Sequence, residues 1–320
     1  MHLLTRVKDV VRSLIGDLPN RVRRRRRIRE LAASQPILSS ERLVTDLDRL
    51  PVRQGTVVLV HSSLKALGFV TGGAEAVVEA LIKVFVERRD GTFMLPTFSI
   101  DGSMHQTLTD GGPFDLRSTP SNLGAIPEAF RRHPKAKRSL HPTHSLAAIG
   151  SKAGWLVEGH HLAGTSFGDG SPMANMLAAD GYLLGLGTDL GRVTFYHCLE
   201  EIEDDFPIDV FTPDSPIDVA CYGHHDQVHR LSIKAHDRAP AKHRIDQPDN
   251  THLRSFFQHR FEDRAGLSWH QIGEAPSWLI EAKKLYAEIK GLMQAGITIY
   301  SSPKDLELFR QRDDNGSDPE

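Results

Sequence analysis

The residues best suited to chemistry lie in one short stretch, where a histidine is followed by two glutamates. Counted from His197, Glu200 lies at i+3 and Glu201 at i+4. If this stretch is helical, at least one carboxylate can accept a hydrogen bond from the imidazole and fix its tautomer. A histidine oriented in this way can act as the general base that removes a proton from an amine. The alternative is a histidine at a helix start that pairs with a surface glutamate.

A second polar group follows an apolar run at residues 56–60. Small hydroxylated residues and free backbone N–H groups at such a turn can hold a phosphate or an amide-rich chain. The turn is not a Walker loop, because the pattern Gly-x-x-x-x-Gly-Lys-Ser/Thr is absent. The group consists of His61, Ser62, Ser63, Leu64 and Lys65.

A third polar group comes directly before the apolar residues 146–149. It contains Arg138, Ser139, His141 and His144. A histidine in such a turn either contacts a ligand or satisfies local backbone groups. Both interpretations stay open for His141, whereas the second is favoured for His144.

The segment at 98–120 is too long for a plain connection between two elements. It carries several acidic residues, among them Asp115, whose carboxylates could bind a cation. We expect this segment to be a lid that faces the substrate. The alternative is an ordinary mobile insertion.

Short apolar strands that alternate with helices predict an α/β fold, with a central mixed sheet flanked by helices. In such sheets the loops after the carboxyl ends of the strands usually hold the ligand, which is where the polar groups fall. The expected strands are 56–60, 92–95, 145–149, 183–186 and 228–233. The expected helices are 73–88, 121–131, one that starts near residue 194 with Thr194 as N-cap, and an amphipathic helix at 276–293.

Composition is consistent with a cytoplasmic enzyme of one catalytic domain. The chain has 320 residues, 39% of them hydrophobic, which is enough to bury a core without disulfides. Its two cysteines have no zinc-binding spacing around them. No apolar run approaches the roughly 20 residues that cross a bilayer, and the start does not resemble a signal peptide.

Charge is distributed unevenly along the chain. Residues 1–30 carry ten basic and three acidic residues, while the rest of the chain carries 29 basic and 38 acidic ones. The acidic remainder suits a cationic substrate better than a nucleic acid. The basic start predicts an amphipathic helix at 3–15 that docks on the protein, with peripheral contact to an anionic membrane or an acidic partner as the alternative.

These features divide the chain into three parts. Residues 1–36 form the basic N-terminal extension, 37–312 a single catalytic domain, and 313–320 a polar tail that we expect to be disordered. The sequence does not indicate an oligomeric state.

Taken together and in order, the motifs resemble the aminoglycoside 3-N-acetyltransferase family from about residue 42 to residue 300. The resemblance is distributed over the chain rather than confined to one motif. Its pieces are VLVHSSLKALG at 58–68, GTFMLPTFS at 91–99, FD at 114–115, TPSNLGAIPEAFR at 119–131, RSLHPTHSLAAIG at 138–150, GDGSP at 168–172, LLGLGTD at 183–189 and TFYHCLEE at 194–201.

The resemblance implies acetyl-CoA as co-substrate, a small-molecule amine as acceptor and direct transfer without a metal. It also implies an α/β fold distinct from the common small acetyltransferase fold. His197 takes the role of the base and Glu200 that of its carboxylate, with Glu201 as a substitute or a contact to the acceptor. The residues expected to hold CoA are His61, Ser62, Ser63, Leu64, Lys65, Arg138, Ser139 and His141, and Asp115 is expected to bind the acceptor.

One departure from the aminoglycoside enzymes concerns the acceptor. Arg192 lies between Asp189 and Thr194, which places a cation where a cationic antibiotic would bind. We expect Arg192 to bind the acceptor, through a carboxylate or phosphate that the acceptor carries. The acceptor is therefore either an aminoglycoside or related amino sugar, or a nucleotide-linked or polysaccharide-precursor amino sugar. The acidic residues at 200–209 favour the former if they face the substrate.

Three rival chemistries remain at this point. Cys198 could carry the acyl group, but on a helix it points about 100° away from its neighbour His197. A hydrolase could use Ser145 or Ser63, although no Gly-x-Ser-x-Gly elbow is present. The last alternative is a protein that binds CoA without catalysis.

Overall fold

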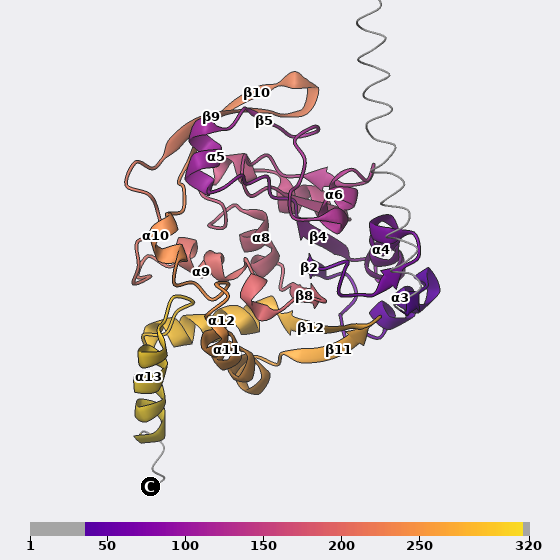
Figure 1. Cartoon of the computed structure of the whole chain (residues 1–320). Coiled ribbons are helices and arrows are strands. Elements are labelled where there is room, and N and C mark those ends of the chain that lie inside the picture. Colours follow the sequence, from indigo (N-terminus) through magenta and orange to yellow (C-terminus); the bar gives the residue numbers. More distant parts are fainter. Residues whose placement is uncertain (1–35, 316–320) are drawn as a thin grey trace, which may run out of the picture.

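The structure is a computed structural model, and it describes residues 36–315 (Figure 1). The basic extension expected at 1–36 lies outside the described residues, apart from its last position. Helix α13 (Pro303–Asn315) includes the first three residues of the tail predicted at 313–320, and the other residues of that tail lie outside the described range. None of the helices within the described range is long and apolar enough to cross a membrane.

A seven-stranded mixed sheet forms the centre of the molecule, as the sequence predicts. Its strand order is β11-β12-β8-β2-β4-β7-β6. The three middle strands run parallel to one another, and the outer strands are antiparallel to their neighbours. The strands are β2 (Val57–Ser62), β4 (Thr92–Pro96), β6 (Lys137–Arg138), β7 (Leu146–Gly150), β8 (Tyr182–Leu186), β11 (Ser268–Ile272) and β12 (Ala275–Glu281).

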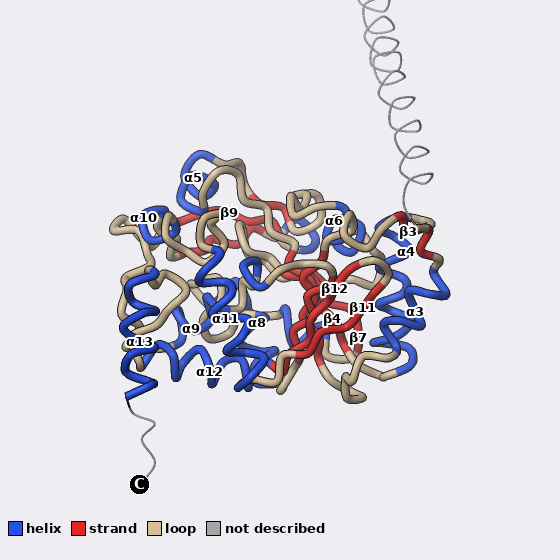
Figure 2. Tube along the Cα trace, turned by 60° about the horizontal axis from the view of Figure 1, so that its bottom comes forward, coloured by secondary structure: helices blue, strands red, loops and turns tan. Residues whose placement is uncertain are grey.

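Helices cover both faces of this sheet (Figure 2). Successive residues of a strand point to opposite faces, so Val57 and Leu59 of β2 pack into one core while Val58 and Val60 pack into the other. One face carries α3 (Ser40–Asp48), α4 (Gly73–Leu81), its π-helical continuation η1 (Ile82–Arg88) and α6 (Ala125–Arg131). The other carries α7 (Ala153–Val157), α8 (Pro172–Ala178), α9 (Tyr196–Ile202), α11 (Thr251–Arg264) and α12 (Ala282–Gln294).

A small second sheet packs apart from the first, at the top of Figure 1. It contains β5 (Phe114–Asp115), β9 (Ile217–Tyr222) and β10 (Val228–Ile233) and shares a core with helix α5 (Met104–Asp110). Both α5 and β5 belong to the segment 98–120, so this segment is a packed part of the domain. The remaining short elements are β1 (Ile37–Leu38), β3 (Phe69–Val70), α10 (Arg238–Ala241), and the 3₁₀ turns η2 (His160–Leu162), η3 (Leu190–Arg192) and η4 (His224–Asp226).

Two helix predictions were wrong in their extent. The helix expected at 276–293 is in fact strand β12 followed by α12, which begins only at Ala282. Residues 278–280 are buried on both faces of the sheet, so their continuous apolar pattern does not distinguish strand from helix. The helix expected at 121–131 begins at Ala125, because Gly124 before it has a φ of 115°.

The contact between β8 and β12 leaves room for no side chain at Gly185. A Cβ at this position would overlap the indole of Trp278, which is fully buried and donates its Nε1–H to the carbonyl of Thr188 at 2.8 Å. We therefore expect Gly185→Ala to lower the free energy of unfolding by about 1–3 kcal/mol through overpacking. The midpoint of urea unfolding measures the effect.

The matched control is Gly291→Ala in α12. No atom lies within 4 Å of a Cβ at that position, so alanine is expected to leave stability unchanged or to raise it by up to about 1 kcal/mol through helix propensity. Equal midpoints for the two variants would show that the Trp278 contact does not constrain the sheet.

Candidate functional site

The connection between β8 and α9 positions the histidine singled out by its spacing. Gly187 turns the chain with a φ of 68°, and the carboxylate of Asp189 then caps turn η3 by accepting the Gly191 N–H at 2.9 Å. Helix α9 follows, with His197 as its second residue. The predicted N-cap was wrong, since Phe195 occupies that position and the hydroxyl of Thr194 contacts the sulfur of Met173 instead.

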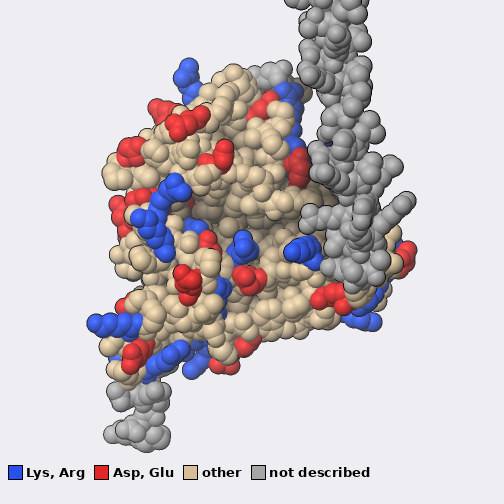
Figure 3. Space-filling view, in the orientation of Figure 1, with Lys and Arg blue, Asp and Glu red and all other residues tan. Residues whose placement is uncertain are grey.

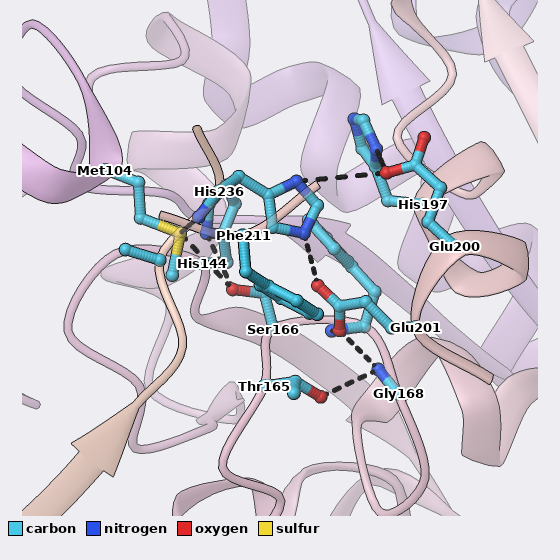
Figure 4. Close-up of polar contacts among 12 residues, drawn as sticks. Met104, His144, Thr165, Ser166, Gly168, His197, Glu200, Glu201, Phe211 and His236 are labelled. Atoms are coloured by element: carbon cyan, nitrogen blue, oxygen red, sulfur yellow. Dashed lines mark hydrogen bonds and ion pairs between the residues drawn. The ribbon is translucent and has the colours of Figure 1, made fainter. Parts of the chain in front are cut away.

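His197 and Glu200 form a buried hydrogen-bonded pair (Figure 4). Nδ1 of His197 lies 2.7 Å from Oε2 of Glu200, whose side chain is fully buried, and the Tyr300 hydroxyl donates to the other oxygen at 3.0 Å. Burial raises the pKa of Glu200, but the neighbouring histidines and the Tyr300 hydroxyl outweigh burial and lower it. The carboxylate is therefore an acceptor, so in the neutral imidazole Nδ1 carries the proton and Nε2 has the lone pair.

Glu201 points elsewhere and does not substitute for Glu200. One of its oxygens accepts the backbone N–H groups of Phe167 and Gly168, and the other lies 2.6 Å from Nε2 of His236. Its side chain is fully buried. Glu201 thus anchors a loop and a second histidine rather than contacting an acceptor.

The second histidine, His236, was missed by the sequence analysis. It follows β10 in the chain, and its ring meets that of His197 edge-on, with 5.2 Å between centroids. Burial lowers the pKa of His236, but the hydrogen bond to Glu201 and the charges of Glu201 and Glu200 outweigh burial and raise it. No spacing in the sequence links His236 to the motif at 197–201, so only the fold reveals it.

Two clefts meet at His197. The residues His197 and Arg244 line both of them. The first, which we call the Ser62 cleft, has a volume of about 570 Å³. The second, the Arg238 cleft, has about 630 Å³. Both volumes lie in the range of small-molecule sites. An imidazole nitrogen at the junction of two clefts can act between two reactants.

The Ser62 cleft contains buried polar atoms that no protein group satisfies. They are Nε2 of His61, Oγ of Ser62 and Oγ1 of Thr188. Unpaired buried polar atoms are costly and call for a ligand or water partner. This cleft is therefore equipped to bind a polar ligand.

The residues predicted to hold CoA divide into two sets. His61, Ser62 and Ser63 line the Ser62 cleft, together with Arg192 from η3. Leu64 packs instead against the core shared with α3, α4 and α6, and Lys65 is exposed and does not line this cleft.

The second set, Arg138, Ser139 and His141, lines neither cleft. The guanidinium of Arg138 donates to backbone carbonyls and hydroxyls at 97–99, 116, 119 and 145, and it lies over the Phe114 ring at 4.8 Å. Burial lowers the pKa of Arg138 to about 9. Ser139 bonds His160, and His141 is fully buried against the same ring. Arg138 and Ser139 thus hold the loop together, while Nε2 of His141 is buried without a protein partner.

Asp115, predicted to bind the acceptor, also serves its own loop. Its carboxylate accepts the backbone N–H groups of Arg117 and Ser118, which are the main reason that its pKa is lowered. It lines neither cleft.

Two of the three rival nucleophiles, Cys198 and Ser145, are poorly placed, whereas the third, Ser63, lines the Ser62 cleft. Cys198 is fully buried, and burial raises the pKa of its thiol well above the usual value. Ser145 is also buried, with its hydroxyl held between Arg138 and the carbonyl of Thr97. Neither lines the Ser62 cleft or the Arg238 cleft.

One group of residues has ligand atoms close enough to hold a metal ion. His197, Glu200 and His236 each offer one such atom, all within 4.8 Å of one another. However, the direct contact between His197 and Glu200 already satisfies the nitrogen and oxygen that face each other. The arrangement fits a hydrogen-bonded base better than a coordination sphere.

Comparison with known proteins relates this chain to one family. A family model described as aminoglycoside 3-N-acetyltransferase matches residues 59–294. An aminoglycoside N(3')-acetyltransferase-like protein of Bacillus subtilis is 33% identical over 178 residues, and aminoglycoside N(3)-acetyltransferase III of Serratia marcescens is 37% identical over 175. Each match covers 51% of this chain and 64% of the relative, which is less than two thirds of its length.

The fold extends over a larger part of the chain than these sequence matches. The structure titled AAC-VIa bound to sisomicin is 25% identical and superposes with a TM-score of 0.63. The superposition covers 79% of this chain and 96% of that one.

Four buried histidines around the site predict a sensitivity to acid. Burial lowers the pKa of His61 to about 4 and that of His160 to about 3, and it lowers those of His141 and His144 well below 6.5. Below pH 6.5 these rings take up protons in the unfolded chain but not in the folded one. Stability should therefore fall as the pH decreases from about 6.5 to 5, by at most about 1.4 kcal/mol per pH unit for each ring.

Urea unfolding of the His160→Gln variant at several pH values tests this prediction. The variant should show a shallower decrease of unfolding free energy between pH 6.5 and 5 than the parent protein. His243→Gln, at an exposed position, should keep the parent slope. A parent slope in His160→Gln would mean that His160 takes up protons to the same extent in the folded and the unfolded chain, which contradicts the prediction.

Proposed function

Because the chain belongs to the aminoglycoside 3-N-acetyltransferase family, we propose that it transfers the acetyl group of acetyl-CoA to the amine of a small acceptor. The observation that carries the proposal is the His197–Glu200 pair at the junction of two clefts. The names of the relatives and the sisomicin complex of AAC-VIa support an amine as the acceptor. CoA and the amine are both substrates in this scheme.

The Ser62 cleft is the proposed place of the CoA thioester. CoA offers a pantetheine arm with amide groups and a diphosphate, which match the unpaired polar atoms of His61, Ser62 and Thr188 and the cation of Arg192. The hydroxyls of Ser62 and Thr188 are also the candidates for stabilising negative charge on the thioester oxygen during attack. The amine then enters from the Arg238 cleft.

The proposed reaction is a direct transfer. Nε2 of His197 takes a proton from the acceptor ammonium or from the attacking amine, a C–N bond forms at the carbonyl carbon, and the C–S bond to CoA breaks. Glu200 stabilises the imidazolium formed in this step. Holding both reactants on either side of one imidazole supplies a further part of the acceleration.

Replacing the base tests the proposal. His197→Ala should lower kcat by about 10²- to 10⁴-fold, because a positioned base contributes on that scale. The Kd for CoA, measured by calorimetry, should change little. Cys198→Ala should retain activity, and an acetylated Cys198 trapped in the parent enzyme would overturn direct transfer. Tight CoA binding without turnover of any amine would favour a protein that only binds CoA.

The carboxylate has its own test in Glu200→Gln. The neutral side chain keeps the shape but no longer stabilises the charged imidazole, so kcat should fall by about 10²-fold or more while the KM for acetyl-CoA stays near that of the parent. Glu203→Gln is the matched control, since Glu203 bonds Tyr286 and Lys290 outside both clefts. Equal kcat values for the two variants would remove Glu200 from the mechanism.

A further inference from the structure

We propose that the acceptor carries an anionic group, a phosphate or a carboxylate, in addition to its amine, and that Arg238 and Lys242 bind this group in the Arg238 cleft. The inference rests on the proposed function, because it assigns this cleft to the amine. It narrows the acceptor from any amino sugar to one whose negative charge is recognised.

The cations of this cleft are available to a ligand. Arg238 and Lys242 are exposed and come from α10 and the residue just after it, and their side chains make no hydrogen bond or ion pair with any residue in the described range. Arg244, the third cation lining the cleft, is held instead by both carboxylate oxygens of Asp246. Two uncompensated cations therefore face the same cavity.

The acidic side chains near this cavity already have hydrogen-bond partners within the protein. Asp237 is the one carboxylate among the lining residues of the Arg238 cleft, and it caps α10 by accepting the Ala239 N–H at 3.0 Å. Glu200 and Glu201 are fully buried and bonded to histidines and backbone N–H groups. A polycation entering here would meet cations and find no free cluster of carboxylates.

The acidic stretch at 200–209 adds no carboxylate to the lining of these clefts. None of its residues lines either cleft. Figure 3 shows the face with the central hollow, which is bordered by Lys and Arg side chains as well as by Asp and Glu. The charge that a bound acceptor meets is therefore set by α10 and the residues that follow it.

Arg238 and Lys242 lie in a different cleft from the one proposed to bind CoA. Arg192 lines the Ser62 cleft with the unpaired polar atoms, whereas Arg238 and Lys242 line only the Arg238 cleft. Since His197 stands between the two clefts, the cations on each side serve different substrates. In this scheme Arg192, which the sequence analysis assigned to the acceptor, binds the phosphates of CoA instead, and Arg238 and Lys242 bind the anion of the acceptor.

Steady-state kinetics with a panel of acceptors test the inference. The panel contains glucosamine, glucosamine 6-phosphate, a 2-amino-2-deoxyuronic acid and sisomicin, with CoA release as the signal. We expect kcat/KM for the phosphate or the uronic acid to exceed that for glucosamine by about tenfold or more, since a hydrogen bond to a charged group is worth on that order. The arm that responds identifies phosphate or carboxylate as the anion.

The double variant Arg238→Gln/Lys242→Gln should raise the KM for the anionic acceptor by about tenfold or more and leave that for acetyl-CoA unchanged. Arg192→Gln should raise the KM for acetyl-CoA and leave that for the anionic acceptor unchanged. The control Lys283→Gln/Arg310→Gln removes two exposed cations outside both clefts and should match the parent protein.

Two results would overturn the inference while leaving acetyl transfer intact. One is a preference of the parent enzyme for sisomicin or glucosamine over both anionic acceptors. The other is a rise in the KM for acetyl-CoA in the Arg238→Gln/Lys242→Gln variant, which would assign these cations to CoA. Absence of turnover with every acceptor would instead contradict the proposed function itself.

Discussion

A buried carboxylate is the constraint on which the site depends. Glu200 is fully enclosed, and an ion in that position is tolerated only if its oxygens are paired. The imidazole of His197, three residues earlier on the same helix, and the hydroxyl of Tyr300, 100 residues further along the chain, supply those partners. The hydrogen bond that stabilises the carboxylate of Glu200 also fixes the tautomer of His197. One interaction therefore both satisfies the buried charge and orients the base.

The neighbouring carboxylate extends this arrangement to the second sheet. Glu201 lies on the same helix but turns to His236, which follows strand β10, and to the backbone N–H groups of residues 167–168. The small sheet, a loop and helix α9 are thereby joined next to His197. His236 lines the Arg238 cleft and lies two residues before Arg238 in the chain. The contact between Glu201 and His236 therefore also helps to position the cations of this cleft.

The sequence predicted the local relations well and the distant ones poorly. The i+3 spacing of His197 and Glu200 defines their contact once the stretch is helical, and the alternation of strands and helices is sufficient to predict a central mixed sheet. His236 and Tyr300 reach the site only through the fold. Arg138 was predicted to hold CoA because it is a cation among polar residues, but backbone carbonyls and hydroxyls of residues 97–99, 116–119 and 145 accept hydrogen bonds from its guanidinium. Strand β12 was missed since a run buried on both faces has no period of two.

The net charge of the chain does not predict the charge at the site. The acidic excess of residues 31–320 suggests a cationic partner, yet charges separated by more than about 8 Å are largely screened at physiological salt. A bound acceptor responds to the side chains within a few ångströms, and in the Arg238 cleft these are two unpaired cations and a carboxylate engaged as a helix cap. The excess acidity can influence how a substrate approaches the protein. Which substrate stays long enough to react is decided by the few charges that line the cavity beside His197.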